Sequence, residues 1–231
     1  LATVHLAKCY FSQGKIKEAK ETAIDAFKIF ENRAENSFLL GEIAMREKRY
    51  NDAIRWFENC LIDVPNGLLG VYIPYYNYET YRKLVFAYNY VGKIAEARQY
   101  CIKYLFYYPD DKDFLFNLML FNKHEKVYKV GWTVTNDKWH WENGSHRIRR
   151  LLVHEELNRG NKCISMTLDG NWEKGLECQT VVICTFSEET LRWIKRYKQA
   201  GIKIIFDDNE FISHYPYQDA VMKEADYIVC C

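Results

Sequence analysis

The chain has 231 residues, of which 48% are apolar and 27% charged, enough for one large folded domain or two modest ones. Its 32 lysines and arginines nearly balance 31 aspartates and glutamates, which gives no electrostatic reason to expect a nucleic-acid partner. No apolar run approaches the roughly 20 residues that cross a bilayer, so we expect no transmembrane segment, and no signal peptide is visible.

The cysteines are scattered and lack the paired spacing of a zinc site. Several have apolar neighbours, where a free thiol acts as a small hydrophobic side chain. We therefore expect no metal centre and a reducing, cytoplasmic setting, with peripheral attachment at the inner membrane as an alternative. The sequence starts at Leu1 and stops inside an apolar run at Cys231, so we expect it to be a piece of a longer protein.

The first half of the chain contains copies of one pattern, at about 3–33, 37–67 and 81–111. In each copy, apolar residues recur at the spacing of one helix face, and small residues let two helices approach closely. Gly14 and Gly92 stand where the turn between two helices needs a permissive backbone, and a proline ends the second helix of the later copies. The first two copies align at a spacing of 34 residues: Leu6 with Leu40, Ala19 with Ala53, and Ala26 with Cys60.

About ten extra residues separate the second and third copies, around the segment NGLLGVYIPYYNYE. The tyrosines of this insertion either line a groove or pack between the repeats, and both interpretations are open. They are Tyr72, Tyr75, Tyr76, Tyr78 and Tyr81. The whole pattern resembles the tetratricopeptide repeat over residues 1–121, with a capping helix at 112–121. The resemblance implies a helical solenoid that serves as a scaffold or binds a protein partner in its groove.

A different pattern begins after a short linker at 122–126. Segments of β-forming residues alternate with helical segments, which predicts a mostly parallel sheet with helices on both faces. The expected fold class is therefore α followed by α/β, a solenoid and then a Rossmann-like half-domain at 127–231. The expected strands are 127–134, 162–168, 180–186, 202–206 and 226–231, and the expected helices are 145–160, 187–201 and 217–225.

Acidic residues follow one of these strands at the end where parallel sheets bind ligands. Asp207, Asp208 and Glu210 come directly after the strand 202–206, with His214 close by. Asp207 and His214 are the candidate bases for taking a proton from an incoming hydroxyl. Pairing with an arginine and a solvated loop are the alternatives. A metal site is disfavoured, because the rest of the chain does not supply ligands at the required spacing.

Basic residues crowd the start of the helix expected at 145–160, where the helix dipole is already positive. Free backbone N–H groups and arginines together suit an anion such as phosphate or carboxylate. The alternative is that one arginine pairs with Asp207 or Asp208 and the rest face solvent. The candidate binding residues are Ser145, His146, Arg147 and Arg149.

The loop before these residues carries Trp141, which suits stacking on a sugar ring and suits packing equally well. The same loop has only Gly144 in place of a G-x-G-x-x-G sequence. A standard dinucleotide site is therefore not expected.

The sequence from RIRRLLVHEELNRGNKCISM through TVVICTFSEETLRWIKRYKQAGIKIIFDDNEF to ADYIVCC resembles the amino-terminal half of a two-Rossmann (GT-B) glycosyltransferase. The matching features are a Ser/Arg loop that opens the first helix and a strand that ends in acids. Here they are Ser145, Arg147, Arg149, Asp207, Asp208 and Glu210. Separately, the repeats with their insertion are similar to those that follow family 2 glycosyltransferase domains.

These resemblances imply transfer of a sugar from a nucleotide-sugar donor to a hydroxyl of a glycan, lipid or protein acceptor, without a tightly bound cofactor. In the GT-B arrangement the donor is held mainly by a second Rossmann domain, which this sequence lacks. The fragment alone is therefore expected to be inactive. The alternative is a non-enzymatic repeat scaffold that recruits protein partners and carries a degenerate α/β module.

Overall fold

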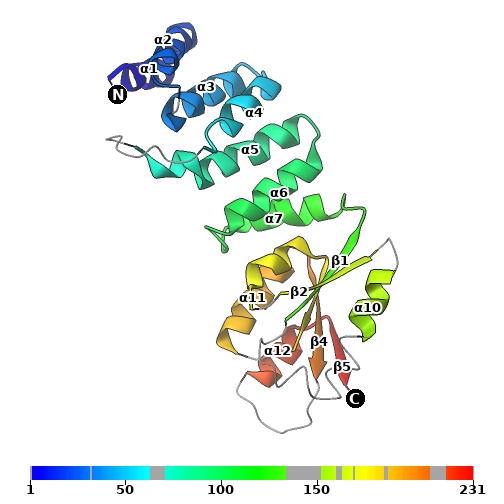
Figure 1. Ribbon diagram of the computed structural model, residues 1–231. Coiled ribbons are helices and arrows are strands. Elements are labelled where there is room, and N and C mark those ends of the chain that lie inside the picture. The colour runs from blue at the N-terminus through cyan, green and yellow to red at the C-terminus, as the bar shows by residue number, and fades with distance from the viewer. Residues whose placement is uncertain are drawn as a thin grey trace. The chain divides into compact units, whose positions relative to one another are not determined.

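The computed structural model describes residues 2–31, 33–62, 71–133, 152–159, 163–168, 170–184, 187–208 and 217–230. They divide between two compact units, Leu1–Tyr107 and Tyr108–Cys231. The first unit is built of helices, and the second contains a parallel sheet with helices beside it (Figure 1). The predicted fold class, α followed by α/β, is confirmed.

The described part of the first unit forms three helical hairpins. They pair α1 (Ala2–Ser12) with α2 (Ile16–Ile29), α3 (Ala34–Arg46) with α4 (Tyr50–Glu58), and α5 (Tyr78–Tyr90) with α6 (Ile94–Leu105). Successive hairpins pack side by side, as in a tetratricopeptide-type solenoid (Figure 1). Ala19, Ala53 and Ala97 are fully buried at 0% exposure in the second helix of each pair, where a small side chain permits close approach.

The three hairpin turns close with the same pair of backbone hydrogen bonds. In the first turn the N–H of Gly14 donates to the carbonyl of Phe11 at 3.1 Å, and the N–H of Lys15 donates to the carbonyl of Tyr10 at 2.9 Å. This pair is typical of a helix that ends in a left-handed residue. Gly14 and Gly92 have φ of 77° and 74°, as predicted, and Lys48 occupies the equivalent position with φ of 59°.

Most of the predicted helix face is buried. Leu40 and Leu84 are 3% and 0% exposed, and Cys60 is 0% exposed. The prediction is wrong for Leu6, which is 47% exposed. Ala7 is buried in its place, because this residue packs against Ala19 and other side chains of the core of the first two hairpins.

The described part of the second unit contains five parallel strands in the order β2-β1-β3-β4-β5. They are β1 (Tyr128–Trp132), β2 (Cys163–Thr167), β3 (Thr180–Ile183), β4 (Lys203–Asp208) and β5 (Tyr227–Cys230). The prediction of a parallel sheet is confirmed, and β3 is its central strand with every residue buried. The order of the strands reverses between β1 and β3, which makes their carboxyl ends the switch point of the sheet.

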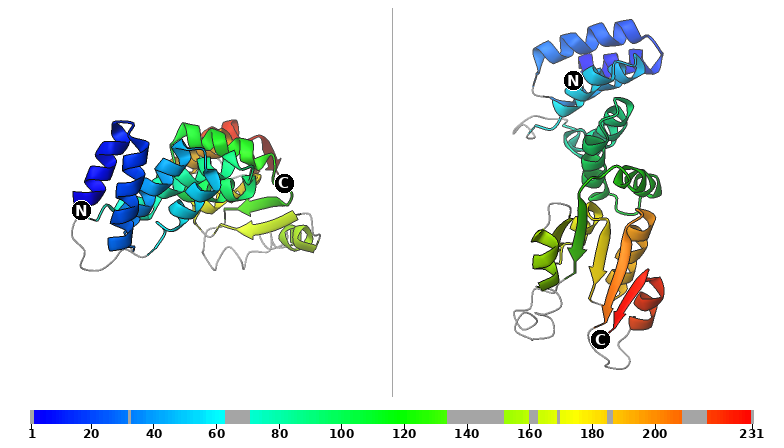
Figure 2. Two further views of the ribbon diagram at one scale, coloured as in Figure 1. Left: turned by 90° about the horizontal axis from the view of Figure 1, so that it is seen from above. Right: turned by 90° about the vertical axis from the view of Figure 1, so that its right-hand side faces the viewer.

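Helices lie on both sides of this sheet. Figure 2 (right) shows α10 (Leu152–Arg159) on one side and α11 (Glu188–Gln199) with α12 (Gln218–Glu224) on the other. Ser187 caps α11 by accepting the N–H of Thr190 at 3.0 Å, a role for which serine is strongly preferred at helix starts. A 3-10 helix, η3 (Trp172–Glu177), lies in the crossover from β2 to β3, where the sequence analysis placed no element.

Helix α7 (Lys112–Asn122), assigned from sequence to the end of the repeats, contacts α11 in the second unit. The Asn122 amide donates to the carbonyl of Ala200 at 3.4 Å. Asp110, just before α7, binds Arg196 through two hydrogen bonds of 2.6 and 2.8 Å. Among the described helices, none combines the length and the apolar composition needed to cross a bilayer.

Candidate functional site

Thr133 ties the carboxyl ends of β1 and β3 together at the switch point. Its N–H donates to the carbonyl of Val182 at 2.9 Å, and its hydroxyl accepts the N–H of Cys184 at 2.9 Å. The hydroxyl also donates to Val182 at 3.3 Å, and Thr133 is only 5% exposed. The two chain segments that leave these strands therefore start from a fixed point. Sequence reasoning missed this role, because a single threonine after a strand carries no signal.

The segment that leaves β1 after Thr133 holds the predicted basic group. Its candidate residues lie outside the described part of the chain, so their predicted binding roles stay predictions. They are Trp141, Ser145, His146, Arg147 and Arg149.

Asp207 and Asp208 are the last two residues of β4, where they pair in register with Val229 and Cys230 of β5. The strand thus runs two residues further than the predicted end at Phe206. Asp207 is 7% exposed, so this carboxyl group belongs to the strand end and not to a solvated loop.

Parallel strands end at the same edge, and β3 alone separates β4 from β1 in the sheet. Two strand spacings of about 4.8 Å each put the carboxyl end of β4 about 10 Å from that of β1. Asp207 therefore lies on the same edge from which the segment of Arg147 departs. Glu210 and His214 follow Asp208 and lie outside the described residues, as does the side chain of Asp208.

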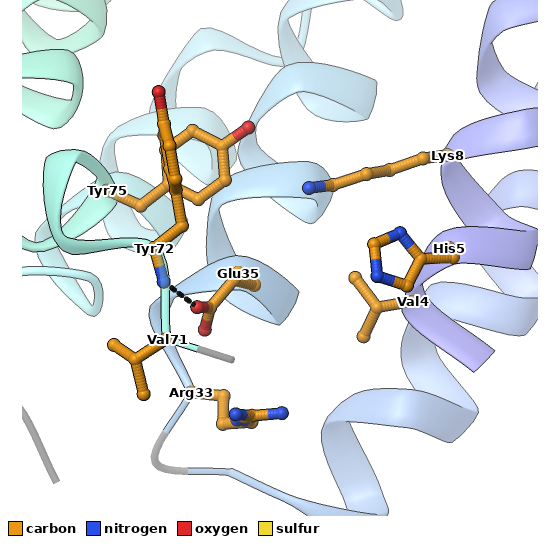
Figure 3. Close-up of a pocket in the computed structure, with 8 residues that line it drawn as sticks. All are labelled: Val4, His5, Lys8, Arg33, Glu35, Val71, Tyr72 and Tyr75. Carbon is orange, nitrogen blue, oxygen red and sulfur yellow. Dashed lines mark hydrogen bonds between the residues drawn. The ribbon is translucent and has the colours of Figure 1, made fainter. Parts of the chain in front are cut away.

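A second candidate site is a cavity of about 400 Å³ inside the first unit (Figure 3). Three separate stretches of the chain supply its walls: α1, the start of α3, and the insertion before α5. Its lining residues are Val4, His5, Lys8, Arg33, Glu35, Val71, Tyr72 and Tyr75. The tyrosines were candidates from sequence, and the other residues were not.

Glu35 holds the insertion against the start of α3. One carboxylate oxygen accepts the backbone N–H of Tyr72 at 2.6 Å, and the other accepts the hydroxyl of Tyr76 at 3.4 Å. The oxygen of Tyr76 in turn accepts the N–H of Ala34 at 3.2 Å. Glu35 and Tyr76 are 5% and 6% exposed, so the two bonds of Tyr76 are buried, and the bond from Tyr72 is partly buried.

Tyr75 forms the aromatic wall of the cavity. Its ring stacks on Phe38 with a centroid distance of 4.0 Å, and the ammonium of Lys8 lies 4.9 Å from its centroid. Burial, with the carboxylate of Glu42 nearby, raises the pKa of Tyr75 to about 12, so the phenol is neutral at physiological pH. The sequence left open whether these tyrosines line a groove or pack between the repeats, and the structure shows both. Tyr72 and Tyr75 line a cavity, and Tyr76 is buried in the packing of the unit.

Among the described residues, no cluster of three His, Cys, Asp or Glu side chains is close enough to hold a metal ion.

Comparison with protein-family models gives no match, and comparison with curated proteins gives none either. Solved structures that resemble the chain include MamA, at 20% identity over 53% of this chain and 66% of that one, with a TM-score of 0.44. They also include the APC/C hetero-tetramer Cut9-Hcn1, at 21% identity, 54% and 23% coverage and a TM-score of 0.45. A mutant O-GlcNAc transferase of Thermobaculum terrenum aligns at 8% identity with 100% of this chain and 41% of its own, with a TM-score of 0.41.

The chain therefore spans less than two thirds of the length of each of these structures. Identities and TM-scores at this level do not indicate a shared function. The geometry of the chain itself defines its class: a tetratricopeptide-type helical solenoid followed by a Rossmann-like parallel sheet.

Proposed function

We propose that the chain is part of a glycosyltransferase, which moves a sugar from a nucleotide-sugar donor to an acceptor hydroxyl. The repeats serve as a scaffold and a protein-binding module. The observation that carries the proposal is the position of Asp207 and Asp208 at the carboxyl end of β4, in a parallel sheet whose order reverses between β1 and β3. Open parallel sheets bind ligands at this edge. The resemblance of residues 127–231 to GT-B glycosyltransferases supports the proposal independently.

The reaction breaks the bond between the anomeric carbon and the donor phosphate oxygen, and forms a bond from that carbon to the acceptor oxygen. The nucleoside diphosphate leaves with the electron pair, and the acceptor hydroxyl loses its proton. In the proposal Asp207 accepts that proton, with His214 as the alternative base. Asp208 and Glu210 bind sugar hydroxyls.

The basic segment after β1 stabilises negative charge in this scheme. Arg147 and Arg149, with Ser145 and His146, hold anionic groups, because charged donors at a helix start favour phosphate or carboxylate. Trp141 stacks on a sugar ring. The nucleotide-sugar enters as donor substrate, and the scheme needs no tightly bound cofactor.

The test is a transfer assay on the intact protein with a panel of nucleotide-sugars, since glycosyltransferases of the GT-B type hold the donor mainly in a second domain. Release of nucleoside diphosphate and labelling of an acceptor are measured together. We expect turnover with at least one donor, and a loss of about 100-fold in Arg147→Ala. Arg159→Ala is the matched control, because Arg159 is exposed and pairs only with the neighbouring Glu156 among the described residues.

Wild-type turnover in Arg147→Ala would remove this residue from the site. Absence of any nucleotide-sugar binding, together with a stable protein partner on the repeats, would favour the scaffold alternative.

A further inference from the structure

The insertion places an aromatic side chain on the face of the repeats that α1, α3 and α5 form. Tyr75 stacks on Phe38 of α3 with a centroid distance of 4.0 Å and an interplanar angle of 14°. The ammonium of Lys8 from α1 lies 4.9 Å from the centroid of the Tyr75 ring (Figure 3), and that of Lys83 from α5 lies 5.9 Å from the centroid of Phe38. One position on this face is therefore occupied by a ring of the chain itself.

A second pocket lies further along the same face. Its volume is about 430 Å³, and α1, α3 and α5 supply its walls. Glu42 and Met45 of this pocket follow Phe38 by four and seven residues, which places the three on one face of α3. Lys83 joins the two positions, since it lies over Phe38 and pairs with Glu42 at 2.7 Å. The pocket thus continues the surface on which the insertion rests.

Aromatic rings form most of the walls of this second pocket. Phe11 of α1 and Phe86 and Tyr90 of α5 all line it. Neighbours fix two of these rings: Tyr90 stacks on Tyr50 at 4.6 Å, and the guanidinium of Arg46 lies 4.4 Å from the ring of Phe11. Phe86 and Tyr90 are 38% and 62% exposed, so apolar surface remains to be covered at a preformed site.

The charged side chains of the pocket favour a ring over an aliphatic group. Glu42 and Lys83 neutralise each other as an ion pair. Within the described residues no carboxylate pairs with Arg46, which is held against Phe11 by its ring contact and by a hydrogen bond of 3.2 Å to the carbonyl. A cation is attracted to the face of an aromatic ring, which an aliphatic side chain lacks. An uncharged aromatic occupant therefore suits both the rings and Arg46.

The insertion also shows what kind of molecule this face of the repeats accepts. It is a polypeptide segment, whose backbone N–H at Tyr72 donates to Glu35 at 2.6 Å and whose ring at Tyr75 stacks on Phe38. The face thus holds a backbone group and an aromatic side chain of the same segment. The volume of the second pocket is within the range of sites that hold a few side chains, so it can receive a further segment of this kind.

We propose that the second pocket binds an aromatic side chain, from phenylalanine, tyrosine or tryptophan, of a partner protein whose segment lies beside the insertion along α3. The inference deepens, and rests on, the proposed role of the repeats as a protein-binding module. It specifies the side chain that anchors the partner. It also makes the insertion the boundary of the binding site, because Tyr75 already covers the neighbouring position on Phe38.

The test begins with selection of short random peptides, displayed on phage, against the full chain. One enriched peptide is synthesised with a fluorescein label and an amidated end, and binding is measured by fluorescence anisotropy. We expect one aromatic residue of the peptide whose replacement by leucine weakens binding about tenfold. The affinity should change by less than about twofold between about 0.05 and about 0.5 M salt, because the contact is not between opposite charges.

Phe86→Ala should lower the affinity for this peptide by about tenfold, since it removes one aromatic wall of the pocket. Phe86→Leu keeps most of the bulk and should still lower it by about threefold, because the ring is lost. Phe106→Ala is the control, since it truncates a phenylalanine of the first unit that is 58% exposed and lies outside the pocket. Circular dichroism verifies that all three variants fold.

Equal binding of the aromatic and leucine peptides, or equal effects of Phe86→Ala and Phe106→Ala, would overturn the aromatic pocket alone. A steep fall of affinity with salt would likewise overturn it, since a charged group would then be the anchor. Enrichment of no peptide would overturn the pocket and the protein-binding role of the repeats together. The transfer assay on the sheet is independent of these results.

Discussion

Glu35 and Tyr72 are 37 residues apart in sequence, and the carboxylate of Glu35 accepts the backbone N–H of Tyr72 at 2.6 Å. The bond joins the first turn of α3 to the insertion before α5. It is partly buried, and the other oxygen of Glu35 accepts the hydroxyl of the buried Tyr76 at 3.4 Å. One side chain therefore positions the wall on which the cavity of the first unit depends.

Removing this carboxylate should destabilise the first unit. We expect Glu35→Ala to lower the free energy of unfolding by about 2 kcal/mol, because the buried hydroxyl of Tyr76 and the partly buried N–H of Tyr72 lose a charged acceptor. Glu35→Gln should lose less, since the amide oxygen still accepts the N–H of Tyr72. Urea unfolding followed by circular dichroism measures both, and Glu21→Ala, at an exposed position of α2, is the control. Equal stability of Glu35→Ala and the control would contradict the role of Glu35.

Lys48 offers a stabilising substitution. It has φ of 59° at the turn position that glycine occupies in the other two hairpins. A side chain in this conformation is disfavoured by about 1–2 kcal/mol, part of which is offset by the greater freedom of glycine in the unfolded chain. We expect Lys48→Gly to raise the free energy of unfolding by about 0.5–1 kcal/mol, and Gly92→Ala to lower it by a similar amount. A destabilised Lys48→Gly would show that Lys48 makes a compensating contact.

Local sequence patterns were enough to predict most elements of the fold. Ala53 and Leu40 follow the helical period of one buried face, and Ser187 with the following acids marks a helix start, so neighbours in sequence determine these features. The exposure of Leu6 was mispredicted, because its neighbour Ala7 fits the same period and takes the buried position. The order of the strands was not predicted, since it depends on which strands pair across the sheet.

The candidate sites were predictable only where one stretch of chain defines them. Asp207 follows an apolar strand, so its place at the carboxyl end of β4 could be expected. The hydrogen bond from Thr133 to Val182 joins residues 49 positions apart, and no local sequence pattern predicts such a contact. The cavity is built from α1, α3 and the insertion, and its basic residues look like ordinary surface residues in the sequence. Such sites depend on tertiary contacts.

The pair Asp110 and Arg196 should make the stability of the second unit depend on pH. The hydrogen bond from Arg196 lowers the pKa of Asp110 below its ordinary value of 3.8. The contribution of the pair to the free energy of unfolding is therefore complete above the ordinary pKa of 3.8. It disappears as the pH falls through the lower pKa of Asp110 in the folded protein.

We expect Asp110→Asn to cost about 0.5–1 kcal/mol at pH 7, since the pair is bidentate but Asp110 is 78% exposed. The difference from wild type should shrink as the pH falls below the ordinary pKa of 3.8 and vanish once the pH is below the lowered pKa of Asp110 in the folded protein. Thermal unfolding from neutral to acid pH measures it, with Asp25→Asn as a control in an exposed surface pair. If the stability difference between wild type and Asp110→Asn grew as the pH fell, the pair with Arg196 would not be the source of the pH dependence.

The most direct test of the account is the turnover of Asp207→Asn in the intact protein, assayed with the donor that gives the highest transfer rate. The substitution keeps the shape of the side chain and removes its ability to accept a proton. We predict a loss of turnover of at least about 100-fold in a protein that still folds, as circular dichroism would verify. Asp219→Asn, which alters an exposed carboxylate in the first turn of α12, should retain full activity. Wild-type turnover in a well-folded Asp207→Asn protein would contradict a transfer site at the carboxyl edge of this sheet.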